Sequence, residues 1–109
     1  MAFAVRIVNL YKELKETKQE YILSKQLLRS GTSIGANTRE SINAQSKNDF
    51  LNKLSIALKE ADETEYWLEL LYRTDYLDRN QYQSFQQDAS ELIKILTAII
   101  KKLKSNSGQ

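Results

Sequence analysis

Residues 23–41 read LSKQLLRSGTSIGANTRES, and this stretch places one inward-facing residue at every third or fourth position. Residues at that spacing form the seam by which a helix packs against its neighbours. The seam consists of Leu23, Leu27, Ser30, Ile34, Asn37 and Ser41. Half of it is small or polar, and Gly31 and Gly35 lie beside it. We predict one unbroken helix, because the repeat keeps its phase on both sides of the glycines, although each Gly costs about 1 kcal/mol relative to Ala.

Three further segments carry the same three-four repeat, which predicts amphipathic helices rather than strands. Their inward positions are Phe3, Ile7, Leu10 and Leu14; Phe50, Leu54, Ala57, Ala61, Thr64, Leu68 and Leu71; and Tyr82, Phe85, Ala89, Leu92, Leu96, Ile99 and Leu103. The predicted helices span 2–15, 18–44, 47–74 and 79–104, with a frayed tail at 105–109. Because the connections are short, neighbouring helices should run antiparallel. The sequence therefore predicts one all-α domain, residues 1–109, folded as an antiparallel up-down four-helix bundle.

Three pairs of polar residues predict where helices begin. Thr17 with Glu20 indicates a capping box at the start of the second helix. The third and fourth helices should begin after Ser46 with Asp49 and after Asp78 with Gln81.

Composition excludes several classes of function. The 109 residues contain no Cys, no His and no Pro, so thiolate chemistry, disulfides and imidazole catalysis are absent. No phosphate-binding loop or nucleophile elbow is present. Without His, the carboxylates of the third helix fit a di-metal site poorly. We predict a cytoplasmic, non-enzymatic protein without membrane span, cofactor, metal or small-molecule substrate.

Charge is unevenly distributed along the chain. The net charge is +5 over residues 1–59, −7 over 60–91 and +4 over 92–109. In an up-down bundle one end should gather the nucleic-acid candidates Arg39, Lys47, Lys53, Lys94, Lys101, Lys102 and Lys104, together with Arg6. Such an end suits phosphate contacts. The alternative is that lysines near a helix C-terminus complement its dipole and solubilise the tail.

The third helix carries a second apolar face. Ile56, Tyr66, Trp67 and Leu70 fall opposite its core positions on a 3.6-residue wheel. A helix that is apolar on two faces in a four-helix bundle indicates an oligomer interface. The alternative is a set of scattered surface apolar residues.

A polar ladder follows one flank of the second helix. Its members are Arg29, Ser33, Asn37 and Glu40, and their predicted partners on the third helix are Asp62, Glu65 and Glu69. We interpret the ladder as a buried network that fixes helix register. A ligand pocket is the competing interpretation.

Two runs of residues carry a resemblance to a known family. The runs are RSGTSIGAN at 29–37 and ADETEYWL at 61–68. In these, the chain resembles the bacterial four-helix-bundle proteins encoded by intervening sequences of 23S rRNA genes, over essentially its whole length. A related branch is the accessory protein of diversity-generating retroelements, which works with a reverse transcriptase and its RNA. The chain departs from the family after Asn37, where TRES replaces a usual Ile-x-Glu-Gly.

The resemblance implies a ring-like homopentamer and a possible nucleic-acid partner. Two functions follow as hypotheses. The first is an RNA- or ribonucleoprotein-associated accessory protein that binds nucleic acid through the basic end. The second is a structural scaffold, or a protein-binding ring for an enzyme such as a reverse transcriptase, without direct nucleic-acid contact.

Overall fold

The structure, a computed structural model, describes residues 1–106 and consists there of four helices without a strand. Their bounds are α1 Ala2–Glu16, α2 Leu23–Ile42, α3 Lys47–Arg73 and α4 Arg79–Asn106. The predicted all-α antiparallel four-helix bundle is confirmed. Of the predicted frayed tail, Ser105 and Asn106 are assigned to the last turn of α4, and the other residues lie outside the described part of the chain.

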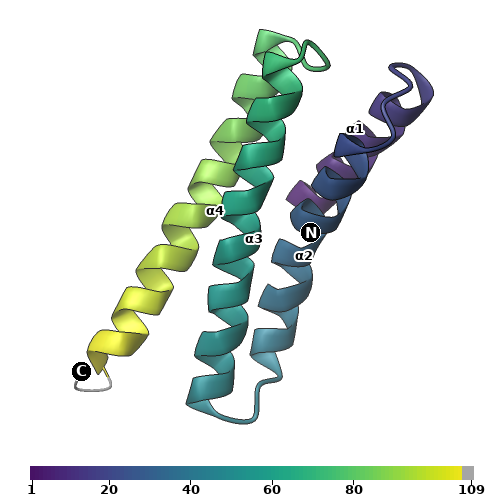
Figure 1. The fold of residues 1–109 in the computed structure, drawn as a ribbon. Coiled ribbons are helices and arrows are strands. Elements are labelled where there is room, and N and C mark those ends of the chain that lie inside the picture. Colours follow the sequence, from purple (N-terminus) through teal and green to yellow (C-terminus); the bar gives the residue numbers. More distant parts are fainter. Residues whose placement is uncertain (107–109) are drawn as a thin grey trace.

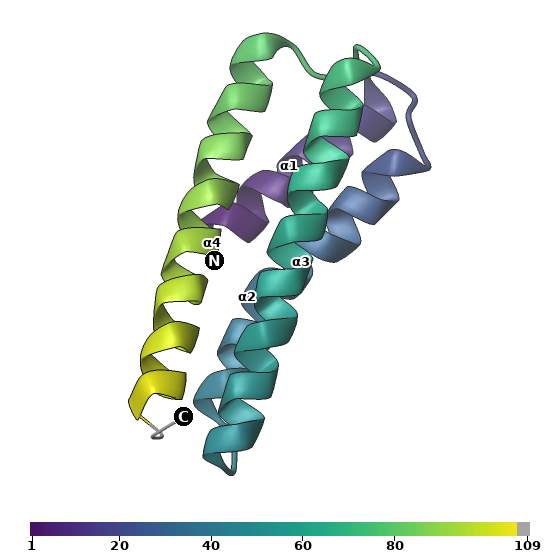
Figure 2. The same cartoon turned by 60° about the vertical axis from the view of Figure 1, so that its left-hand side comes forward.

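The four helices differ in length. The molecule measures 50 × 22 × 20 Å, and α2, α3 and α4 run side by side along its length (Figure 1). Helix α1 has 15 residues against 27 in α3, so at about 1.5 Å per residue it is little more than half as long. Figure 2 shows its N-terminus beside the middle of α4. One half of the bundle therefore has four helices and the other has three.

The core is divided in the same way. One buried cluster includes Ile7, Leu10 and Leu14 of α1, packed with Leu27, Leu68, Leu71, Leu77, Phe85 and Ala89. The other cluster contains no buried α1 residue and consists of Ile34, Leu54, Ala57, Ala61, Leu96 and Ile100. Burial of these side chains supplies most of the driving force for packing, at about 1.5–3 kcal/mol for each large one.

The start of α2 differs from the prediction. The predicted capping box of Thr17 and Glu20 is wrong, because Glu20 N donates to Leu14 O at 2.9 Å and Gln19 adopts a left-handed φ of 55°. These features extend the turn, and the helix begins five residues later than predicted. The buried Glu20 carboxylate instead accepts from the backbone N–H groups of Ile22, Leu23 and Ser24 at 2.7–3.1 Å. A carboxylate at this position satisfies free donors and complements the helix dipole.

The other two predicted caps are confirmed. Ser46 Oγ accepts from Asp49 N at 3.0 Å at the start of α3. Asp78 Oδ1 accepts from Gln81 N at 2.7 Å, and Gln81 Oε1 accepts from Asp78 N at 3.3 Å. The second pair is a reciprocal capping arrangement at the start of α4.

Small residues in α2 allow close packing, and α2 is unbroken across both glycines as predicted. A Cβ at Gly31 would lie 2.9 Å from Cγ1 and Cγ2 of Ile7, so only glycine admits α1 at this distance. The fully buried hydroxyls of Ser30 and Thr64 are hydrogen-bonded across the α2–α3 contact at 3.0 Å. The buried hydroxyl of Ser30, a polar residue of the seam, thus finds its hydrogen-bond partner on α3.

One predicted core position in α4 is wrong. Ile99 is 39% exposed, whereas its neighbour Ile100 is 8% exposed and belongs to the core. The reason is geometric, because α1 ends before it reaches the side of α4 on which Ile99 lies.

Candidate functional site

At the three-helix end of the bundle α2 ends, α3 begins and α4 ends (Figure 1), and these segments are rich in basic residues. This basic end, defined as Arg39, Lys47, Lys53, Lys101, Lys102 and Lys104, contains six cations within residues 36–53 and 97–106, against the two acids Glu40 and Asp49. Antiparallel helices bring together these segments, which are distant in the sequence. The sequence predicted that these charges would lie at one end of the bundle, and the helix bounds place the segments of these six residues there. Lys94 lies about two turns further up α4.

Most cations of the basic end face solvent. Arg39, Lys47, Lys101 and Lys102 are exposed, and no ion pair within the described residues engages them. Lys53 differs, because its Nζ lies 3.1 Å from Glu40 Oε2. An exposed pair of this kind contributes little to stability, so Lys53 can exchange Glu40 for another anion at small cost.

Arg6 does not belong to the basic end. Its guanidinium pairs with Asp88, donates to Ser84 Oγ at 2.9 Å, and lies 4.1 Å from the centre of the Phe85 ring. These contacts hold α1 against α4 midway along the bundle. The prediction that Arg6 would join the positive pole is wrong, because α1 is too short to reach it.

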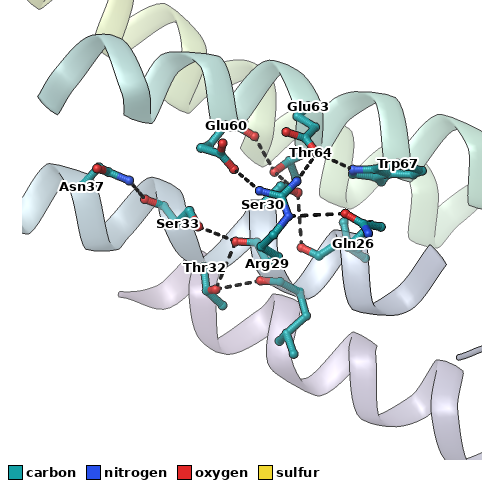
Figure 3. A network of polar contacts seen from close by, with 12 residues as sticks. Gln26, Arg29, Ser30, Thr32, Ser33, Asn37, Glu60, Glu63, Thr64 and Trp67 are labelled. Atoms are coloured by element: carbon teal, nitrogen blue, oxygen red, sulfur yellow. Dashed lines mark hydrogen bonds and ion pairs between the residues drawn. The ribbon is translucent and has the colours of Figure 1, made fainter. Parts of the chain in front are cut away.

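The predicted polar ladder divides into separate contacts (Figure 3). Arg29 Nη1 donates to Glu60 Oε2 at 3.0 Å, and Nη2 donates to Glu63 Oε1. The same Glu63 oxygen accepts from Trp67 Nε1 at 3.1 Å. The prediction that Arg29 would meet Asp62, Glu65 or Glu69 is wrong, because the α2–α3 contact brings Glu60 and Glu63 to its side of α3. The Arg29 side chain is 48% exposed, whereas those of Glu60 and Glu63 are 12% and 30% exposed, so the contact is partly buried on its α3 side.

The remaining ladder residues bond elsewhere. Ser33 Oγ donates to Arg29 O at 2.6 Å, and Asn37 Nδ2 donates to Ser33 O at 2.9 Å, both within α2. Glu40 pairs with Lys53, as described. The bonds of Ser33 and Asn37 stay within α2, so of the four ladder residues Arg29 and Glu40 are the two that bond to α3. The geometry therefore favours a register lock at the helix surface over an enclosed ligand pocket.

Glu65 contacts α4 instead of α2. Its Oε2 accepts from Gln86 Nε2 at 2.6 Å. Burial raises the pKa of Glu65 above the usual 4.5, the charge of Asp62 raises it further, and the bond from Gln86 opposes the rise. Gln86 Oε1 is buried without a hydrogen-bond partner. Such an orphaned acceptor is uncommon in a folded protein, and a proton on Glu65 would supply a donor for it.

The second apolar face of α3, called the aromatic face here and defined as Ile56, Tyr66, Trp67 and Leu70, is partly covered within the chain. Trp67 packs against the core cluster that contains α1. Tyr66 is 60% exposed and meets the Trp67 ring edge-on, with ring centres 5.0 Å apart. Ile56 and Leu70 are half-buried. A single chain therefore leaves the tyrosine uncovered, and the predicted oligomer interface on this face stays a prediction.

Sequence reasoning missed three of these features. The contact of Glu60 with Arg29 was not predicted, because Glu60 lies between the core face and the aromatic face of α3 on a helical wheel. The hydrogen bond of Gln86 to Glu65 was not predicted, because an isolated glutamine belongs to no motif. Arg6 was assigned to the wrong region, although its spacing from Ile7 and Leu10 already placed it on the flank of α1. A register between helices is needed to find such partners, and periodicity within one helix does not supply it.

Within residues 1–106 no cluster of three or more acidic side chains is arranged to hold a metal ion. No helix there combines the length and the apolar composition that are needed to cross a bilayer.

Comparisons with known proteins agree with the resemblance in the sequence. Residues 1–98 match the family model described as 23S rRNA-intervening sequence protein. A crystal structure of a protein with unknown function from the S23 ribosomal protein family of Bacteroides thetaiotaomicron VPI-5482 is similar, with a TM-score of 0.91 and 64% sequence identity. The match covers 92% of this chain and 93% of that one. Among curated proteins, none matches this chain.

Proposed function

Because the chain belongs to the family of 23S rRNA-intervening sequence proteins, we propose that it is a non-enzymatic, homo-oligomeric accessory protein of an RNA or ribonucleoprotein. The observation that carries the proposal is the basic end, where three helix termini bring six cations together against two acids. Four of these cations are exposed and have no ion pair within the described chain.

The basic end suits phosphate better than bases. Its cations are mostly flexible lysines, which act as point charges toward phosphate oxygens. No β-sheet with aromatic platforms is present in residues 1–106, and no helix is isolated for insertion into a groove. Recognition would thus follow the shape and charge of the nucleic-acid backbone.

Self-association strengthens this proposal. One basic end offers a few weak phosphate contacts, and a closed assembly, a pentamer in the proposal, would repeat them around a ring. Linked weak sites raise the overall affinity through effective concentration. The uncovered Tyr66 beside Trp67 supports an interface on α3, since aromatic residues are enriched at such surfaces.

The direct test replaces Lys101, Lys102 and Lys104 with Gln and measures binding to a structured ribosomal RNA hairpin over a series of salt concentrations. We expect weaker binding and a flatter salt dependence, by up to about 0.7–0.9 in slope for each lost phosphate contact. The matched control replaces the three lysines at the other end, Lys12, Lys15 and Lys18. Unfolding curves of both variants establish that the bundle is intact. RNA binding that survives the first change, or that resists high salt, would contradict the proposed location.

The oligomer has its own test. Tyr66→Glu would introduce a charge at the exposed position of the aromatic face, so we expect dissociation with helicity largely retained, measured by light scattering and circular dichroism. A wild-type chain that is monomeric at all concentrations would contradict the homo-oligomer.

The second candidate is a scaffold or a protein-binding ring for an enzyme partner such as a reverse transcriptase. The aromatic face favours it, because it offers an apolar contact surface that does not require nucleic acid. An intact oligomer that fails to bind structured RNA at low salt would favour this candidate over the first.

A further inference from the structure

The face of the bundle on which α1 packs continues past the N-terminus of α1, which lies beside the middle of α4 (Figure 2). On α2 this face includes Gly31, against which Ile7 packs. Gly35, Thr38 and Ile42 follow at steps of four, three and four residues and lie on the same side of the helix. Ile42 is 76% exposed, and a Cβ added at Gly35 would meet nothing within 4 Å. The described chain therefore leaves this part of α2 uncovered.

Helix α4 has a matching line of apolar residues on the side that meets α1. Asp88 pairs with Arg6 of α1. Leu92, Ile95 and Ile99 follow Asp88 at steps of four, three and four residues. Leu92 is half-buried, whereas Ile95 and Ile99 are 56% and 39% exposed. The apolar line of α4 is therefore also uncovered beyond the N-terminus of α1.

Part of this surface forms a groove of about 740 Å³, here called the α2–α4 groove. Its lining is mostly apolar or small and includes Phe3, Ile34, Gly35, Ile42 and Leu92. The step from Gly35 to Ile42 corresponds to about 10 Å along a helix axis. A helix that binds in a groove anchors itself through side chains at i, i+4 and i+7, which span the same length. The open space at Gly35 admits a large side chain, so the groove fits one face of a short helix.

The segments that form the α2–α4 groove carry an excess of positive charge. Residues 31–43 and 92–106 contain five cations against one acid. The acid, Glu40, also lines the groove, but its carboxylate pairs with Lys53 of α3 at 3.1 Å. Arg39 lines the groove, is exposed, and has no ion pair within the described residues. The charge that an occupant would meet is therefore positive.

Two further features add positive potential at the edges of the groove. Lys102 is exposed and follows Ile99 by three residues on the same side of α4. Helix α1 begins beside Met1 and Phe3, which line the groove, and its first turn has neither a side-chain cap nor an acidic residue. No acid of α1 therefore compensates the positive end of its dipole. Acidic side chains that flank an apolar occupant would be attracted at these edges.

We propose that the α2–α4 groove binds an amphipathic helix of a partner protein, with large apolar side chains at i, i+4 and i+7 and acidic residues along its flanks. This inference rests on the second candidate function, the protein-binding scaffold, and names the surface and the chemistry of the partner. The exposed Ile42 and Ile95 favour a protein segment over a nucleic acid, because a sugar-phosphate backbone has no apolar side chains that would cover them.

The test uses three fluorescent synthetic peptides of about three helical turns, which is long enough to cover the groove. The acidic peptide has Leu at i, i+4 and i+7 and Glu at the flanking positions. The basic peptide has the same leucines, with Lys in place of Glu. The third peptide keeps the glutamates and has Ser in place of Leu, so it carries the charge without the apolar face. Fluorescence anisotropy with the full chain measures each dissociation constant.

The acidic peptide should bind at least about tenfold more tightly than either of the other two. Its advantage over the basic peptide should shrink as salt is added, because the charges that produce it are exposed. Its advantage over the Ser-substituted peptide should persist in salt, because burial of apolar surface produces it.

Two substitutions locate the contact on the chain. Gly35→Leu fills the groove and Ile42→Glu places an acid in it, so each should weaken binding of the acidic peptide by about tenfold or more. Ile42→Glu should also strengthen binding of the basic peptide. Neither should unfold the chain, because Gly35 has open space around it and Ile42 is mostly exposed, and circular dichroism checks this. Asn80→Leu, at an exposed position in the first turn of α4, is the matched control for an added leucine and should bind as wild type does.

Four results would overturn the inference. Failure of the acidic peptide to bind the wild-type chain would reject the groove as a helix site. Equal binding of the acidic and Ser-substituted peptides would show attraction by charge alone. Unchanged peptide binding by both Gly35→Leu and Ile42→Glu would place the contact elsewhere. Dissociation of a wild-type oligomer by Gly35→Leu would show that a second copy of the chain occupies the groove.

These results are distinguishable from a failure of the proposed functions. If Tyr66→Glu abolishes peptide binding while Gly35→Leu does not, the scaffold function stands and its contact moves to the aromatic face. RNA binding by the Lys101, Lys102 and Lys104 variant is a separate measurement. A chain that binds structured RNA but not the acidic peptide would therefore overturn this inference and leave the first candidate function in place.

Discussion

Replacement of Gly31 by Ala tests whether the close contact between α1 and α2 depends on a missing side chain. The added Cβ would lie 2.9 Å from Cγ1 and Cγ2 of Ile7 and 3.1 Å from its Cδ1. Ile7 is fully buried, so it has no free space into which to move. The substitution must therefore shift α1 outward or force Ile7 away from a favourable rotamer.

Two opposing terms set the magnitude. Overpacking of a tight core costs about 1–3 kcal/mol, and exchange of Gly for Ala inside a helix returns about 1 kcal/mol. The net loss in the free energy of unfolding should be about 0–2 kcal/mol, or up to about 16 °C in Tm for a domain of this size. Gly35→Ala has the same helix term without a clash, so it should gain about 1 kcal/mol.

A double-mutant cycle with Ile7→Ala isolates the clash. In that background the opposing side-chain atoms are gone, so Gly31→Ala should stabilise by about 1 kcal/mol. Urea unfolding at a fixed chain concentration measures all four proteins, since self-association makes stability depend on concentration. If Gly31→Ala raised stability equally with and without Ile7, the contact would not require glycine.

Three further predictions concern single contacts. Arg29→Ala should lower stability by about 1–3 kcal/mol, because it leaves the 12%-exposed carboxylate of Glu60 without its partner, and an unchanged melting temperature would show that the contact contributes nothing. Ser46→Ala removes the acceptor for Asp49 N and should cost about 0.5–2 kcal/mol, whereas Ser55→Ala within α3 serves as a control with little effect. Glu65 binds its proton more tightly when folded, so its contribution to stability is full below pH 4.5 and is lost as pH rises through the raised pKa. Glu65→Gln should thus raise Tm at neutral pH and weaken its pH dependence, because an amide can donate to the orphaned Gln86 oxygen, and an unchanged pH profile would contradict this assignment.

Features that depend on neighbouring residues could be predicted from the sequence. The three-four repeat of α3 identifies every one of its core positions, because each helix buries the face that its own pattern defines. Ser46 and Asp78 mark helix starts, because their bonds reach only three residues along the chain. The unbroken α2 also followed from its own phase.

Features that depend on two helices at once could not be predicted in this way. The partners of Arg29 depend on the rotation of α3 about its axis relative to α2. The hydrophobic repeat of one helix does not fix this rotation closely enough to choose between neighbouring acidic residues. The exposure of Ile99 depends on where α1 stops, and Glu20 caps α2 only because Gln19 adopts a left-handed turn. The same distinction applies to the candidate site. The basic end could be predicted from the order of the helices, whereas the pairing of Arg6 with Asp88 could not.

The division of the core into two clusters implies that local stability differs along the bundle. Amide protons in the half that contains α1 are held by four packed helices, whereas those near Leu54 and Ile100 are held by three. Local opening is easier where fewer apolar contacts must break, so deuterium should enter the three-helix half first. The region that carries the basic end is then also the one that is most able to adjust its shape to a partner.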